Sequence, residues 1–185
     1  MSTYKFRVLL DNSDHEEIFR DIEIDGEHNF ENFYQKIIES FFFQGDQMAS
    51  FYVSNNDWDK GEEIGLFALE SEDSFEPYHI MQESKIKNFV DKKDQRFILV
   101  YDFLKMWIFL IELIHIDETA TLAAPEIILS IGIAPREASR EIDFGLPSTD
   151  SGDDFGLGND FDDIFSEFED EEDFEGFDNI DDYDI

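Results

Sequence analysis

Apolar and polar residues alternate with a period of two at the start of the chain. In residues 4–11, YKFRVLLD, apolar side chains stand at every second position with basic ones between them, which is typical of a strand with one buried face. Residues 19–25, FRDIEID, predict a second strand that ends at a turn formed by Asp25 and Gly26. We therefore expect a sheet to begin here.

A helical period follows the two strands. Apolar residues recur every three or four positions behind Asn29, a residue type that often caps the start of a helix. A stripe this wide has to lie against a sheet. Its members are Phe30, Phe33, Tyr34, Ile37, Ile38, Phe41 and Phe42.

Shorter apolar segments complete the pattern. Further strands are predicted at 49–54 (ASFYVS), around 64–69 (IGLFAL) and within 126–135 (EIILSIGIAP), where Pro135 ends the segment. Residues 55–63 would form the loop between the first two of these strands. Residues 83–94, ESKIKNFVDKKD, predict a short helix that buries Ile86, Phe89 and Val90.

Residues 96–116, RFILVYDFLKMWIFLIELIHI, form the longest apolar run. A bilayer helix needs about 20 such residues, but a charge at its centre costs about 2.5 to 3.5 kcal/mol, and Asp102, Lys105 and Glu112 all fall inside the run. Two buried strands joined by a turn near 103–106 explain it at lower cost. We therefore expect no membrane span and an α+β fold, with an antiparallel sheet packed against one long and one short helix.

Composition divides the chain in two. The formal net charge is −34 over 185 residues, and residues 143–185 contain no Lys or Arg. We therefore expect a folded domain at 1–142 and a disordered acidic tail at 143–185, which cannot bury enough apolar surface to fold alone. Such a charge disfavours direct binding to nucleic acid. Because an apolar leader is absent after Met1, we expect a cytoplasmic protein.

Candidate chemistry is sparse. No glycine series typical of phosphate binding is present, and the four histidines lack zinc-site spacing. We expect His79 in a loop, and no catalytic residue, metal or cofactor. Asp102 and Glu112 are the only carboxylates in apolar sequence. We expect Asp102 to cap a turn and Glu112 to face solvent on an edge strand.

The order of elements and the hairpin sequence YDF-x-x-x-W together resemble the plasmid pRiA4b Orf-three-like family, whose members are also described as passengers of a transposable element. The resemblance covers about residues 3–138. Its motif residues here are Tyr101, Asp102, Phe103 and Trp107. It implies a prokaryotic α+β domain of unknown function, related to TnpR-like proteins. Many members carry a Gly-Asp-Asp type of turn, whereas this chain has Leu104, Lys105 and Met106, so a site formed by such acids would be lost here.

One basic stretch interrupts the acidity. It lies within residues 85–96 and predicts either a solvated helix face or a binding site for an anionic group. The nearest anionic group along the chain is the tail. Its cations are Lys85, Lys87, Lys92, Lys93 and Arg96.

The apolar residues of the tail, most of them aromatic, follow two different spacings. Helical spacing relates Phe161, Ile164, Phe165 and Phe168. A spacing of three relates Phe165, Phe168, Phe174, Phe177, Ile180 and Tyr183. In an extended chain this second set lines one edge at intervals of about 9 Å. Rings along a negative strand resemble single-stranded nucleic acid, which offers stackable faces and negative charge.

Two functions are open at this point. The first is a non-enzymatic interaction module whose tail binds basic protein surfaces, with an oligomeric state that the sequence leaves unknown. The second is an enzyme or small-ligand binder that uses the hairpin around Tyr101, Asp102 and Trp107, with the tail only for solubility.

Overall fold

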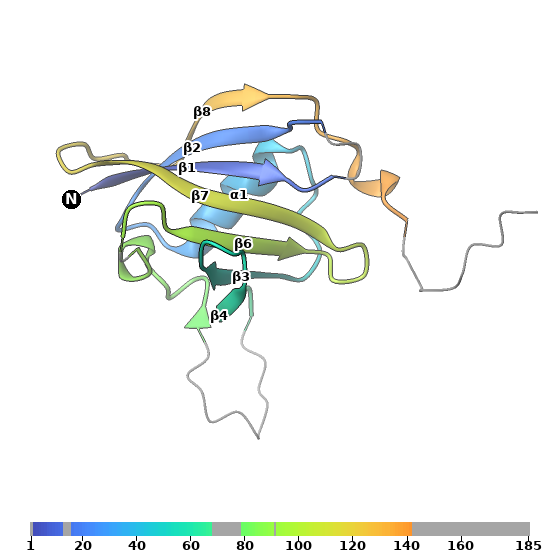
Figure 1. Ribbon diagram of the computed structural model, residues 1–185, viewed down its shortest axis with the longest axis horizontal. Coiled ribbons are helices and arrows are strands. Elements are labelled where there is room, and N and C mark those ends of the chain that lie inside the picture. Colours follow the sequence, from blue (N-terminus) through green and yellow to red (C-terminus); the bar gives the residue numbers. More distant parts are fainter. Residues whose placement is uncertain (1, 13–15, 68–78, 91, 142–185) are drawn as a thin grey trace, which may run out of the picture. The chain divides into compact units, whose positions relative to one another are not determined.

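A computed structural model describes residues 2–12, 16–67, 79–90 and 92–141. These residues form one eight-stranded sheet and one α-helix, which confirms an α+β fold (Figure 1). All neighbouring strands pair antiparallel except β4 and β5. Across the sheet, the strands are β5 (His79–Ile80), β4 (Lys60–Gly65), β3 (Ala49–Ser54), β6 (Arg96–Tyr101), β7 (Trp107–Asp117), β1 (Thr3–Leu10), β2 (Phe19–Asp25) and β8 (Glu126–Ile131).

The long apolar run folds as predicted into two strands. β6 and β7 form a hairpin through the turn at 102–106, and their inward side chains are fully or almost fully buried. Among the described residues, no helix is long and apolar enough to cross a membrane. Glu112, however, was wrongly assigned to an edge strand. It lies on β7, whose neighbours are β6 and β1 in the middle of the sheet.

The helix α1 (Phe30–Ser40) begins at the predicted cap. Asn29 Oδ1 accepts a hydrogen bond from Asn32 N at 2.9 Å, and the Asn32 side chain accepts one from Asn29 N at 3.4 Å. The predicted stripe is buried up to Phe41. Phe42 was wrongly included in it, because the helix has ended there: its φ is +60° and its side chain is 86% exposed.

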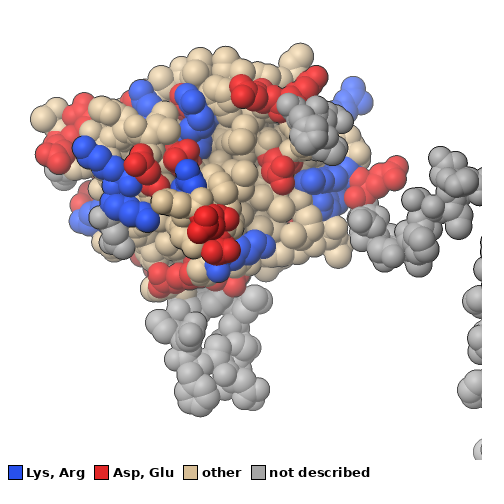
Figure 2. Space-filling model, viewed as in Figure 1, with Lys and Arg blue, Asp and Glu red and all other residues tan. Residues whose placement is uncertain are grey.

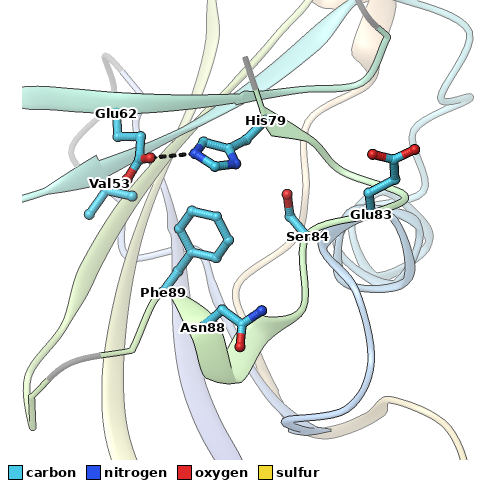
Figure 3. A pocket seen from close by; sticks show the side chains of 7 residues that line it. All are labelled: Val53, Glu62, His79, Glu83, Ser84, Asn88 and Phe89. Atoms are coloured by element: carbon cyan, nitrogen blue, oxygen red, sulfur yellow. Dashed lines mark ion pairs between the residues drawn. The ribbon is translucent and has the colours of Figure 1, made fainter. Parts of the chain in front are cut away.

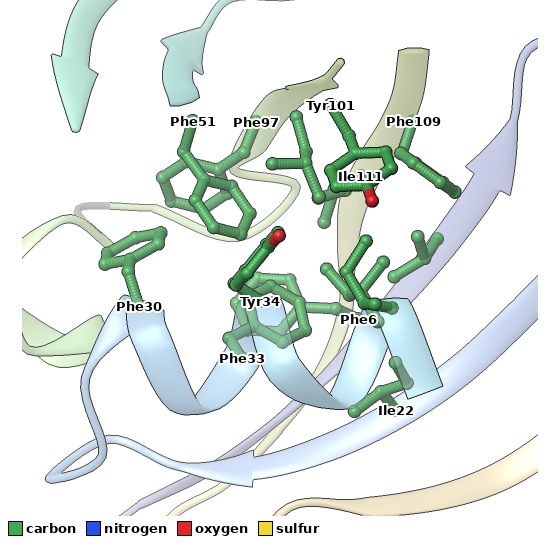
Figure 4. Packing of buried hydrophobic residues seen from close by; sticks show 14 of the residues in the cluster. Phe6, Ile22, Phe30, Phe33, Tyr34, Phe51, Phe97, Tyr101, Phe109 and Ile111 are labelled. Atoms are coloured by element: carbon green, nitrogen blue, oxygen red, sulfur yellow. The ribbon is translucent and has the colours of Figure 1, made fainter. Parts of the chain in front are cut away.

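Rings from α1 and from the strands fill the space between the helix and the sheet (Figure 4). The Phe33 ring lies 5.0 Å from Phe6 of β1 and stacks on Phe51 of β3 at 5.8 Å. Phe30 meets Phe97 of β6 edge-on at 5.4 Å. The helix therefore touches both halves of the sheet through aromatic contacts, which bury the most area per side chain.

Two predicted elements differ in the structure. The strand predicted around 64–69 begins earlier, at Lys60, because Asn55 Oδ1 accepts hydrogen bonds from Asp57 N and Asp59 N and so closes a short loop. The predicted short helix is only a 3₁₀ turn, Ile86–Asn88. Its backbone donors are already used: Ile86 N binds His28 O and Lys87 N binds Gly26 O, so no helical ladder continues.

Replacing the helix cap tests how far α1 depends on it. Asn29→Ala should lower the free energy of unfolding by about 1 kcal/mol, because the Asn32 amide loses its acceptor. Asn29→Asp keeps the oxygen that accepts from Asn32 N but loses the Nδ2 donor to Gln82 O at 2.8 Å, so it should retain part of the stability that Ala loses. Urea unfolding of the two variants measures the difference, and equal losses would contradict a capping role.

Candidate functional site

The hairpin that carries the family motif points its two largest side chains into the core. Tyr101 ends β6 and pairs with Trp107 at the start of β7. Tyr101 is fully buried and Trp107 is 3% exposed. The Phe43 ring lies 4.9 Å from the Trp107 ring, and the Arg140 guanidinium stacks on it at 4.8 Å. Both side chains are therefore occupied by packing.

The Tyr101 hydroxyl is held by a carboxylate from near the end of the described chain. It donates to Glu137 Oε1 at 2.7 Å and accepts a hydrogen bond from Gly45 N at 3.0 Å. The other oxygen of Glu137 accepts from Gln44 N at 2.6 Å. Glu137 thus joins the end of β6, the loop after α1 and the 3₁₀ turn Glu137–Ser139. The sequence gives no signal for this contact, because its partners lie far apart along the chain.

Asp102 caps the hairpin turn, as predicted. It adopts a φ of +56°, and its Oδ1 accepts hydrogen bonds from Leu104 N and Lys105 N, each at 3.1 Å. Phe103, in contrast, is 42% exposed in the turn. The four motif residues therefore divide into two core rings, one turn cap and one exposed ring.

The structure separates the cations of the basic stretch. Lys85 and Lys87 both bind the Glu27 carboxylate. Their hydrogen bonds lower the pKa of Glu27 to about 2, and the bond from Lys87 has the larger effect. Lys92 and Lys93 are exposed in the turn before β6. Arg96 lies on β6, where it pairs with Glu112 at 3.1 Å and stacks on Trp58 at 4.8 Å. Three of the five cations thus already have carboxylate partners.

Arg96 belongs to a set of paired charges on the sheet face away from α1. Figure 2 shows that, on this face, basic side chains lie next to acidic ones and that uncharged residues separate these groups. The pairs are Lys5–Glu23, Arg7–Asp21 and Arg96–Glu112. These three cations therefore already have carboxylate partners.

A cleft of about 310 Å³ opens beside β4 and β5. It is lined by Val53, Glu62, His79, Glu83, Ser84, Asn88 and Phe89. His79 Nε2 lies 2.5 Å from Glu62 Oε1, and the His79 ring meets Phe89 edge-on at 5.2 Å. Figure 3 shows the second ring nitrogen of His79 on the side of Ser84, with the Glu83 carboxylate beyond it. Among the described residues, no Lys or Arg lines this cleft.

The sequence did not reveal the cleft. His79 was wrongly expected in a loop, whereas it lies on β5, where it pairs with Ile64 of β4 in the only parallel ladder of the described sheet. Glu62 was predicted to lie in the loop at 55–63, whereas it lies on β4. No local pattern marks the two residues as neighbours, because a parallel pairing of separated segments brings them together.

The tail residues predicted to bind a partner all lie outside the described part of the chain. They are Phe161, Ile164, Phe165, Phe168, Phe174, Phe177, Ile180 and Tyr183. Within the described residues, no group of three or more His, Asp or Glu side chains is placed to hold a metal ion.

Comparisons with known proteins identify the family and the fold. The chain belongs to the plasmid pRiA4b ORF-3-like protein family, whose model matches residues 2–143. A crystal structure of a protein of unknown function, MM3350 from Methanosarcina mazei Go1, has a similar fold, with a TM-score of 0.61 and 18% identity over 75% of each chain. A comparison with curated proteins found no match. The predicted family resemblance is thus confirmed.

The buried tyrosines predict a loss of stability in alkali. Burial, followed by the Glu137 hydrogen bond, raises the pKa of Tyr101, and burial raises the pKa of Tyr34 to about 12. An unfolded tyrosine ionises near pH 10. Below about pH 10 both phenols are neutral in the folded and the unfolded chain, and their contribution to the free energy of unfolding is complete. As the pH rises toward their folded pKa values this contribution is lost, because the unfolded chain ionises first.

Urea midpoints measured from pH 9 to pH 12 check this linkage. The wild-type midpoint should fall across that window, and the double variant Tyr34→Phe, Tyr101→Phe should start lower but fall less steeply. Parallel slopes for the two proteins would contradict a role for these phenols.

Proposed function

We propose that the protein is a non-enzymatic interaction module that binds basic protein surfaces through residues 143–185. The observation that carries this proposal is the composition of that segment, which combines regularly spaced aromatic rings with many carboxylates and contains no Lys or Arg. Carboxylates attract a basic partner and rings give it contact area and stacking. We place this role in the cytoplasm.

The charge pairing of the folded body supports a separate partner over docking on the chain itself. In the basic stretch, Lys85 and Lys87 already bind Glu27, and Arg96 binds Glu112. A tail that docked there would have to displace these carboxylates or share their cations. The packing of Tyr101 and Trp107 in the core likewise gives the motif hairpin a structural part and favours the tail as the binding element.

The partner that fits this chemistry has a basic groove lined by aromatic side chains. Grooves that bind single-stranded DNA or RNA have this composition, because they track a negative backbone and stack its bases. In an extended conformation, rings spaced by three residues would present stackable faces along one edge. The tail therefore occupies such a groove as a mimic of a single strand.

Replacing the tail rings tests this function. The full chain with Phe165, Phe168, Phe174, Phe177, Ile180 and Tyr183 changed to Ala keeps its net charge. Binding to an OB-fold single-strand-binding protein should weaken at least about tenfold, because each stacked ring contributes about 1 to 3 kcal/mol. Raising the salt concentration should weaken wild-type binding as well.

Two further measurements complete the test. An oligo-dT strand should compete with the wild-type chain for the groove, and a chain that ends at residue 145 should no longer bind. Affinity that is indifferent to salt and to loss of the rings would contradict the proposal. Unchanged binding by the shortened chain would move the function to the folded body.

A further inference from the structure

We propose that the cleft between β4, β5 and the Ile86–Asn88 turn binds one cationic group, the guanidinium or ammonium of a basic side chain on a protein partner. Its volume of about 310 Å³ is near the lower end of the range for small-ligand sites, which is about 300 to 1,000 Å³. The site belongs to the folded body. It relies on the proposed function only for the source of the ligand, a basic partner.

The charge of the lining determines the sign of the ligand. Glu62 and Glu83 contribute two carboxylates, and the described part of the lining contains no Lys or Arg that would neutralise them. Glu62 already contacts His79. The Glu83 carboxylate has no ion-pair or hydrogen-bond partner among the described residues. A cation that entered the cleft would provide one, whereas an anion would be repelled.

The polar atoms of the cleft fit a donor-rich ligand. When His79 donates from Nε2 to Glu62, the neutral ring keeps Nδ1 as an acceptor. Figure 3 shows this second nitrogen and the Ser84 hydroxyl beside one space, with the Glu83 carboxylate beyond Ser84. Hydroxyl and carboxylate oxygens accept hydrogen bonds. Guanidinium and ammonium groups only donate, so the two sets are complementary.

The floor of the cleft adds an aromatic face. The Phe89 ring is fixed by two edge-on contacts, 5.2 Å from the His79 ring and 5.4 Å from the Phe30 ring. Because Phe30 belongs to the core, Phe89 is held in one orientation. A fixed ring in a lining that also carries two carboxylates suits an Arg or Lys side chain, whose charge is attracted to an aromatic face and whose stem packs on it.

A titration of the full-length protein with two matched tripeptides tests this site. The ligand is N-acetyl-Gly-Arg-Gly-amide, and the control peptide carries citrulline, the neutral isostere of arginine. Amide NMR signals of His79, Ser84, Asn88 and Phe89 should shift and saturate with the arginine peptide only. Glu83→Gln should weaken this binding about tenfold, because it removes a charge-assisted acceptor.

Glu16→Gln is the matched control variant, since it removes the same charge at an exposed position outside the cleft lining. It should leave the affinity unchanged, and so should the replacement of the six tail residues by Ala. Phe89→Leu keeps an apolar floor but loses the ring face, and should weaken the arginine peptide while leaving the fold intact.

Equal binding of the citrulline peptide, or equal effects of Glu83→Gln and Glu16→Gln, would overturn the inference, because each would indicate general attraction to an acidic chain. Absence of saturable shifts in the wild-type protein would overturn it as well. If the variant with six tail residues changed to Ala still loses its basic partner in that case, the proposed function stands and only the cleft site fails.

Discussion

In the described part of the chain, one α-helix packs on one face of an eight-stranded sheet, and aromatic side chains fill the space between them. Phe30 and Phe33 of α1 contact rings on β1, β3 and β6, so one short helix reaches both halves of the sheet. Side chains smaller than Phe would leave cavities in a layer this wide. The same demand explains the hairpin motif, whose Tyr101 and Trp107 extend this core toward the loop after α1.

Many charged and polar side chains of the folded body bind other groups of the same fold. Glu137 binds Tyr101 and the backbone of Gln44, while Asp102 binds the backbone of its own turn. Cations of the body pair with neighbouring carboxylates across the sheet. Our functional proposals therefore rest on two other places, the carboxylates that line the cleft and the acidic, aromatic composition of the tail.

Periodicity predicted most of the fold, because it reports directly which side chains are buried. β2 and β3 have the predicted bounds, and α1 begins behind Asn29 as expected. The misses are places where distant partners decide the outcome. The backbone donors of Ile86 and Lys87 bind carbonyl groups of the β2–α1 connection, which prevents a helix, and parallel pairing with β4 makes His79 a strand residue. The motif hairpin was predicted, whereas the cleft depends on contacts that no local pattern encodes.

We assign the binding of cations to the tail and the cleft, and a structural role to the hairpin. Labelling of carboxyl groups, read by mass spectrometry with and without a basic single-strand-binding protein, tests this division directly. We expect protection of the carboxylates in 143–185 and of Glu83, while Glu112, which is paired with Arg96, stays unchanged. Protection centred on Asp102 and Glu112, with none in 143–185 or at Glu83, would contradict it.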